Sequence, residues 1–222
     1  MAKSSRSPDQ EPSTDPSIGG GASARGGAVS TDLQAWLDGS GEKTLSGLID
    51  VFGRNSFALL FVLLLGVPAL PLPTGGATHV FEIVAVLLAL QLIAGRDTIW
   101  LPKRWRDLEL AGKKSERFLN GLLKLIRWLE RLSRPRLRFL FHHRLTDVGF
   151  GLLVVVLTVA AFVAPPFSGL DTLPSLGVVL LSLGVLLDDA LIVALALLVG
   201  AGGVLLEIVA GKAAVTGIGK LV

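Results

Sequence analysis

Apolar residues fall into two long blocks along the chain, 57–95 and 148–222, and a polar, basic stretch separates them. Proline and glycine interrupt the first block and leave two arms of 16 residues, 57–72 and 80–95. As helices, such arms would be about 24 Å long, shorter than the roughly 30 Å hydrocarbon core of a bilayer. The first block therefore predicts either two short spans or a hairpin that enters the membrane and returns.

The second block has a similar interruption and a longer final segment. An apolar run from Val148 ends at Pro165–Pro166, and a second run ends at Asp188–Asp189. The segment 190–210 is apolar except for Glu207 and is long enough to span a bilayer. Ala196 and Gly200 lie four residues apart within it, which permits another helix to approach closely. The Asp188–Asp189 pair is expected to form a turn and to cap the last helix.

The two blocks resemble one another when the chain is shifted by 93 residues. Over 54–96 against 147–189, 11 of 43 positions are identical without a gap. Pro73 falls on Pro166 and Gly76 falls on Gly169, so the breaks coincide as well. Interrupted hydrophobic segments at matching places in two halves are typical of binding sites in membrane proteins. The alternative is that both breaks are plain turns at the membrane surface.

The segments before the first block are polar or amphipathic. Residues 1–30 are rich in Ser, Gly, Pro and Asp, so we expect a disordered cytoplasmic tail. The tail has no apolar region typical of a cleaved signal peptide. Within 31–55, apolar residues recur at helical spacing, which predicts amphipathic helices. These helices lie either at the membrane surface or in the cytosol.

Composition and charge agree with a membrane protein. The chain is 51% apolar with a mean hydropathy of +0.64, and residues 96–147 hold 14 of its 21 basic residues. The positive-inside rule therefore assigns 97–147 to the cytoplasmic side. A helix is expected from Ser115, with a cationic and a leucine-rich face, until Pro135 ends or kinks it. The cationic stripe comprises Arg117, Lys124, Arg127, Arg131, Arg134 and Arg138.

This stripe has two interpretations. It is an anion site for lipid headgroups or an acidic saccharide, with Arg134 and Arg138 as candidate contacts, or it only fixes the topology.

Five further residues are candidates for a substrate site, four in the first block and Gly169 in the second. His79 and Glu82 are three residues apart and share one helix face, as a metal pair or proton relay would require. Two ligands are too few for a metal site. Glu82 also lies near a helix N-terminus, where the dipole favours an anion without any further function. Gln91 is expected either to bond a neighbouring helix or to contact substrate, and Gly76 and Gly169 would allow close backbone approach.

Several short motifs, taken in order, resemble the ExoD family of bacterial membrane proteins linked to exopolysaccharide synthesis. The resemblance covers roughly 45–210 and implies an integral inner-membrane protein, but no catalytic residues. The motifs are LPLPTGG at 70–76, LALQL at 88–92 with GR at 95–96 and WLP at 100–102, and RPRLR at 134–138.

Several functional classes are disfavoured by what the sequence lacks. It has no cysteine, three histidines, no phosphate-binding loop and no serine-nucleophile motif. We therefore expect no metal, no cofactor and no nucleic-acid partner, and an enzyme is disfavoured without being excluded. The predicted function is a multi-pass inner-membrane component of exopolysaccharide synthesis that handles or transports a lipid-linked or anionic saccharide where two repeats meet. The alternative is a scaffold or regulator that contacts other synthesis proteins and transports nothing.

The predicted fold is an all-α integral membrane protein with two related, broken helical hairpins, an intervening basic amphipathic helix and a C-terminal transmembrane helix. Its segments are the tail at 1–30, the amphipathic segment at 31–55, the first hairpin at 56–96, the basic segment at 97–147, the second hairpin at 148–189 and the final helix with a short tail at 190–222.

Overall fold

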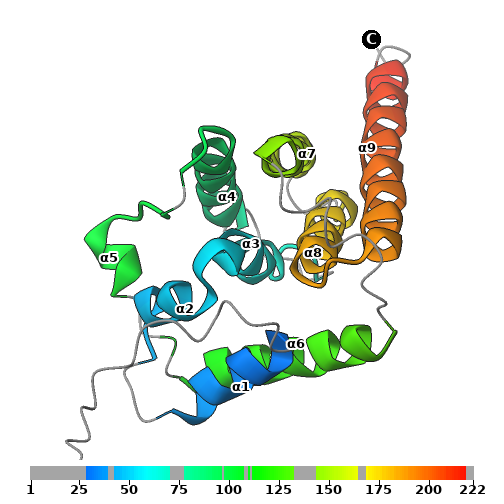
Figure 1. Cartoon of the computed structure of the whole chain (residues 1–222). Helices are drawn as coiled ribbons and strands as arrows, with labels where there is room; N and C mark the ends of the chain where they lie inside the picture. Colours follow the sequence, from blue (N-terminus) through cyan, green and yellow to red (C-terminus); the bar gives the residue numbers. More distant parts are fainter. Residues whose placement is uncertain are drawn as a thin grey trace, which may run out of the picture.

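All regular elements in the described part of the chain are helices (Figure 1). The computed structural model describes residues 29–39, 43–70, 78–96, 98–107, 110, 112–132, 144–164 and 169–218. The expected tail and the Pro/Gly connections at 71–77 and 165–168 lie outside these residues. The main helices are α1 (Val29–Asp38), α2 (Leu45–Phe52), α3 (Ser56–Leu65), α4 (Thr78–Ile93), α5 (Lys103–Arg106), α6 (Lys113–Leu132), α7 (Arg144–Val163), α8 (Thr172–Leu186) and α9 (Ala190–Ile218).

Helices α3, α4, α7 and α8 form a closed ring at the centre of the molecule. Each of them packs against its partner in the same hairpin and against one helix of the other hairpin: α3 contacts α4 and α8, and α7 contacts α8 and α4. The interior holds large apolar side chains, and the rings of Phe61 on α3 and Phe150 on α7 meet edge to face at 5.7 Å. Neither hairpin therefore buries its apolar residues by itself.

Helix α9 packs mainly along α8, through an interface of small residues. A methyl group added at Gly177 of α8 would lie 2.6 Å from the Cα of Gly200 on α9, so the two backbones are in direct contact there. Gly203 is equally close to Pro174, and Ala196 is fully buried. The close approach predicted from the spacing of Ala196 and Gly200 is confirmed.

Helices α4 and α8 end in the same way. Gly95 and Asp188 both adopt left-handed backbone angles, with φ of 74° and 53°. Each of them and the residue after it donate the pair of backbone hydrogen bonds that defines a Schellman motif. At the end of α4, the amides of Gly95 and Arg96 donate to the carbonyls of Leu92 and Gln91, at 2.9 and 3.1 Å. At the end of α8, the amides of Asp188 and Asp189 donate to the carbonyls of Val185 and Gly184, at 3.3 and 2.9 Å.

A polar layer made of α1, α2, α5 and α6 covers the α3 side of the ring (Figure 1). Helix α6 lies along α1, where Ser30 donates hydrogen bonds from its backbone N and its Oγ to the two carboxylate oxygens of Glu130, at 2.9 and 2.5 Å. The aromatic ring of Phe118 on α6 packs over Gly66, just after α3. The leucine-rich face of α6 is buried in these contacts. It consists of Leu119, Leu122, Leu123, Ile126 and Leu129.

Three helix boundaries differ from the sequence expectation. Helix α3 ends at Leu65 and not near residue 72, because the chain turns at Gly66 ahead of Pro68, and the position before a proline disfavours helical geometry. Helix α7 begins at Arg144, four residues earlier than the apolar run. Helix α6 begins at Lys113, so Ser115 lies inside it and is not its cap.

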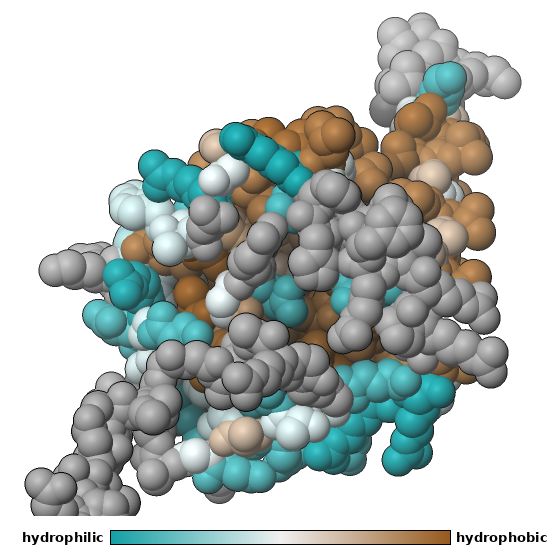
Figure 2. Space-filling view, viewed as in Figure 1, coloured by the Kyte–Doolittle hydropathy of each residue, from teal (hydrophilic) through white to brown (hydrophobic). Residues whose placement is uncertain are grey.

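The remaining sides of the molecule expose large apolar side chains. Figure 2 shows them gathered over α7 and α9, whereas the lower edge, along α6, is hydrophilic. Helix α4 presents a stripe at Val80, Ile83, Leu87 and Leu90, and α7 presents one at Leu152, Val156, Val159 and Val163. Helices α7 and α9 contain segments long and apolar enough to cross a membrane, Arg144–Val163 and Ala190–Ala213, of which only 33% and 22% are buried. A water-soluble core helix would be mostly buried, so these surfaces fit a lipid or protein contact.

Candidate functional site

The predicted pair of His79 and Glu82 is formed. The Nδ1 atom of His79 lies 2.7 Å from Oε2 of Glu82, on adjacent turns at the start of α4. Glu82 is fully buried, and its second carboxylate oxygen, Oε1, has no hydrogen-bond partner in the described part of the chain. His79 is 28% exposed, and its ring stacks edge to face on Phe162 of α7 at 4.9 Å. The pair therefore joins a buried carboxyl group to a partly exposed imidazole.

More polar groups are buried at this end of the ring than the sequence pattern predicts. The hydroxyl groups of Thr158 on α7 and Ser175 on α8 are fully buried and have no partner. The Oε1 atom of Glu207 on α9 is buried and unpartnered as well, and Asp171, next to α8, lies within electrostatic range of both Glu82 and Glu207. Single Thr and Ser residues inside apolar runs give little signal, because their importance depends on the register between helices.

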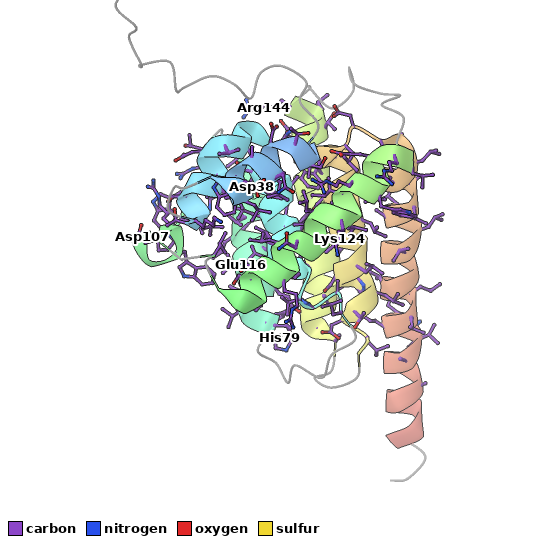
Figure 3. All side chains as sticks on the ribbon, turned by 90° about the horizontal axis from the view of Figure 1, so that it is seen from below. Asp38, His79, Asp107, Glu116, Lys124 and Arg144 are labelled. Carbon is purple, nitrogen blue, oxygen red and sulfur yellow. The ribbon has the colours of Figure 1, made fainter. Side chains whose placement is uncertain are left out.

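His79 lies at the end of the helices opposite to Arg144 (Figure 3). The guanidinium group of Arg144 is packed over Gly95, at the C-terminal end of α4. A cation there is favourable because helix C-termini carry partial negative charge. The buried polar groups and the nearest strongly basic side chain of the ring are thus separated by the length of α4.

Gln91 does not bond a neighbouring helix, which was one of the two roles expected for it; the other, a contact with substrate, stays a prediction. Its Nε2 donates to the carbonyl oxygen of Trp100 at 3.1 Å, and its Oε1 accepts from the backbone N of Trp100 at 2.8 Å. Both ends of the amide are therefore used to hold the connection after α4, and no neighbouring helix is involved. The residue stabilises a loop and is not part of the buried polar group.

Gly169 is needed for its backbone conformation and not for close approach. Its φ is +68°, a region that favours glycine, yet a methyl group added there would meet nothing within 4 Å. The close approach of another backbone that was expected at Gly169 is therefore not found among the described residues. Gly76, the matching residue, lies outside the described residues.

The cationic stripe is described only in part, because Arg134 and Arg138 lie outside the described residues. Lys124, Arg127 and Arg131 are exposed on α6, and Arg127 donates a hydrogen bond to Oε1 of Gln34 on α1 at 3.0 Å. The opposite, leucine-rich face is already covered by protein. A membrane contact of α6 would therefore have to use its cationic side, where Trp128 is also exposed.

Two smaller points bear on the chemistry. Asp189 accepts a hydrogen bond from the backbone N of Leu191 at 2.8 Å and so caps α9, as predicted. Among the residues that the structure describes, no group of three or more His, Cys, Asp or Glu side chains has a geometry suited to a metal ion.

In the part that the structure describes, the chain is thus all-helical, and two of its helices are long and apolar enough to cross a membrane. The sequence model of the family described as "Exopolysaccharide synthesis, ExoD" matches residues 29–209. The chain therefore belongs to the ExoD family, and the resemblance found in its motifs is confirmed.

Two relatives give the range of similarity. The protein ExoD of Rhizobium meliloti is 35% identical over 154 residues, which cover 68% of this chain and 63% of that protein. An uncharacterised protein of Synechocystis is 28% identical over 148 residues, which cover 67% of this chain and 69% of the relative. The chain thus matches less than two thirds of the length of the Rhizobium protein. No solved structure matches it.

Proposed function

We propose that the chain is a multi-pass inner-membrane component of exopolysaccharide synthesis, which handles or transports a lipid-linked or anionic saccharide where its two hairpins meet. The observation that carries the proposal is the contrast between the two sides of the ring helices. Outward, α4 and α7 expose apolar stripes, whereas inward they bury Glu82 and Thr158. Polar groups in the interior of an apolar helix ring are typical of pathways for polar solutes.

The matching ends of α4 and α8 support the proposed repeat. The left-handed residues Gly95 and Asp188 are 93 residues apart, and so are the donors and acceptors of their Schellman hydrogen bonds. In the proposed repeat, α3 corresponds to α7 and α4 corresponds to α8. The contact between α3 and α8 therefore corresponds to the contact between α7 and α4, and both contacts are present. In transporters built from two repeats the binding site lies at the interface between the repeats, which supports the site proposed here.

Membrane placement is supported by the exposed surface of α9. Burying a leucine side chain in an apolar environment is worth about 1.5–3 kcal/mol, and many large apolar residues of α9 are exposed. At about 1.5 Å per residue, Ala190–Ala213 would be roughly 36 Å long, enough for a tilted span. By contrast, α3 has 10 residues and would be about 15 Å long, which fits a hairpin that enters and returns.

Transport is tested with purified protein in liposomes that contain a fluorescent polyprenyl-diphosphate saccharide in one leaflet. We expect saturable movement of the lipid to the other leaflet, and a severalfold slower rate in Thr158→Val, which keeps the side-chain shape but removes the buried hydroxyl. Thr31→Val, on the exposed side of α1, is the matched control and should behave as wild type. An equal rate with and without protein would contradict transport.

The scaffold alternative is favoured by one observation, the exposed cationic side of α6. Since the apolar face of α6 is buried, Lys124, Arg131 and Trp128 are available to membrane lipids or to other synthesis proteins. A strain that loses exopolysaccharide when the gene is deleted, and regains it with a transport-inactive protein, would favour the scaffold. Unchanged exopolysaccharide after deletion would contradict both roles.

A further inference from the structure

The carboxyl group of Glu82 is buried in a place where a negative charge is poorly supported. The side chain is 0% exposed, and its described polar contact is with His79 at 2.7 Å. An ionised carboxylate in an apolar interior costs several kcal/mol unless it is paired and hydrogen-bonded on both oxygens. Here Oε1 has no partner among the residues that the structure describes. The arrangement thus favours a carboxyl group that is neutral for part of the time.

The packing of α4 on α7 places a second unpartnered group opposite Glu82. The two helices run antiparallel, since a methyl group added at Gly151 of α7 would lie 3.2 Å from the carbonyl oxygen of Ala89, and Phe162 stacks on His79. Thr158 is seven residues after Gly151 and four before Phe162, so it lies on the same face of α7. Glu82 is seven residues before Ala89 on the same face of α4. Because the helices are antiparallel, Thr158 and Glu82 therefore lie at the same height along the pair. The Thr158 hydroxyl is 0% exposed and unpartnered.

Apart from His79, the described titratable group within electrostatic range of Glu82 is acidic. Helix α3 contains no titratable residue, and those of α7, Arg144 and Asp147, lie at the opposite end of the ring. Helix α8 contains none within its bounds, but Asp171 precedes it and is within electrostatic range of Glu82. From α9, Glu207 lies near Asp171. In this part of the structure, His79 is thus the titratable base in contact with Glu82.

A proton is the ligand that this site fits. A metal ion needs several converging ligands, and the described residues contain no such group. A proton needs one carboxylate oxygen, and it leaves a neutral carboxyl group that needs no counter-charge in the apolar interior. His79 is partly exposed, so its imidazole can exchange protons with water on one side and with Glu82 on the other.

We propose that Glu82 is a proton-binding site that His79 connects to the aqueous surface. In the transfer, His79 takes a proton from water at Nε2 and gives its Nδ1 proton to Oε2 of Glu82, which leaves a neutral imidazole and a neutral carboxyl group. Reversal of these steps releases the proton. The proposal rests on the membrane placement of the hairpins but requires no saccharide, and it would supply a coupling ion if the chain transports one.

The test is infrared difference spectroscopy of the full chain in lipid nanodiscs between acidic and alkaline pH. We expect a carbonyl band of a protonated carboxylic acid that disappears on alkalinisation and is absent from Glu82→Gln. In His79→Gln the band should persist but form more slowly after a pH jump. Glu116→Gln, on the exposed side of α6, is the matched control and should keep the wild-type spectrum.

A band that survives unchanged in folded Glu82→Gln, or that responds to sodium at constant pH, would overturn the proposal. If Glu82→Gln does not fold, it is replaced by Glu207→Gln labelled with ¹³C in the glutamate carboxyl groups, since Glu207 is the other glutamate with a buried Oε1 atom among the described residues. The band should then shift, whereas aspartate labelling should leave it in place; the opposite result would also overturn the proposal. A normal band in a chain that moves no saccharide would contradict the proposed transport and leave the proton site intact.

Discussion

Individual residues with left-handed backbone angles fix how the helices of the ring begin and end. Gly95 and Asp188 terminate α4 and α8, and Gly169 lies just before α8 with a φ of +68°. Only glycine, and to a lesser degree asparagine and aspartate, adopts such angles without strain. Aspartate at position 188 can thus adopt the left-handed conformation that glycine adopts at the matching position 95.

The first prediction concerns Gly169. Space is open around Gly169, so a substitution there is limited by the backbone angle and not by the size of the new side chain. We expect Gly169→Val to lower the free energy of unfolding by about 1–2 kcal/mol, whereas Gly169→Asn should cost only a fraction of that. Thermal unfolding followed by circular dichroism measures the difference. Gly149→Val, at an open helical position of α7, is the control; an equal loss in all three variants would contradict the argument.

At the scale of elements, helix packing depends on which faces meet. The small residues of α9 bring its backbone against α8, and the buried leucines of α6 attach the polar layer to the ring. If the interface of α8 and α9 lies in lipid, it is stabilised by van der Waals contact and not by hydrophobic burial. Its stability therefore depends strongly on how closely the two surfaces fit. A change of shape there should therefore matter more than a change of polarity.

The second prediction tests this interface with two glycines of one helix. In Gly203→Leu the new side chain would collide with α8, since even a methyl group there would lie 2.7 Å from Cδ of Pro174 and 2.8 Å from its backbone N. We expect a loss of about 1–3 kcal/mol, or a decrease of the melting temperature by several degrees in a chain of this size. Gly202→Leu points into open space and should be nearly neutral. Equal melting temperatures of the two variants would show that the packing described here is wrong.

The sequence predicts most of the elements but not what covers them. The helical spacing of Leu119, Leu122 and Ile126 predicts an amphipathic helix, yet lipid and protein interiors attract the same leucines, so the actual cover by α1 and the ring could not be predicted. His79 and Glu82 were identified because their spacing is local. Thr158 was missed because its role depends on the register between α4 and α7, which no pattern within either helix specifies.

The whole molecule has a polar side and an apolar side. Helices α1, α2, α5 and α6 cover the ring on one side, while α4, α7 and α9 expose apolar residues on others (Figure 2). A chain that spans a bilayer must keep charged side chains out of the hydrocarbon core, so α6 has to lie in the headgroup layer, in water or against a protein. Two positions, one on each side, can therefore report how the molecule is placed.

The third prediction uses the absence of cysteine from the natural chain. In Leu198→Cys, a 73% exposed position of α9, we expect no reaction with a water-soluble maleimide until detergent removes the membrane. In Lys124→Cys, on α6, reaction should be rapid in inside-out membrane vesicles and absent in intact cells, because the basic segment is assigned to the cytoplasm. Rapid reaction of Leu198→Cys in both preparations would contradict the membrane placement of α9.

The crosswise contacts of the ring have a consequence for how the protein is made. Equivalent positions of the two hairpins are 93 residues apart, and at synthesis rates of about 5–20 residues per second the second hairpin emerges roughly 5–20 s after the first. During this interval the inner faces of α3 and α4, including the carboxyl group of Glu82, lack the helices that cover them. The first hairpin should therefore depend on the insertion machinery until α7 and α8 arrive, and a ribosome that stalls between the hairpins should leave an intermediate open to proteolysis.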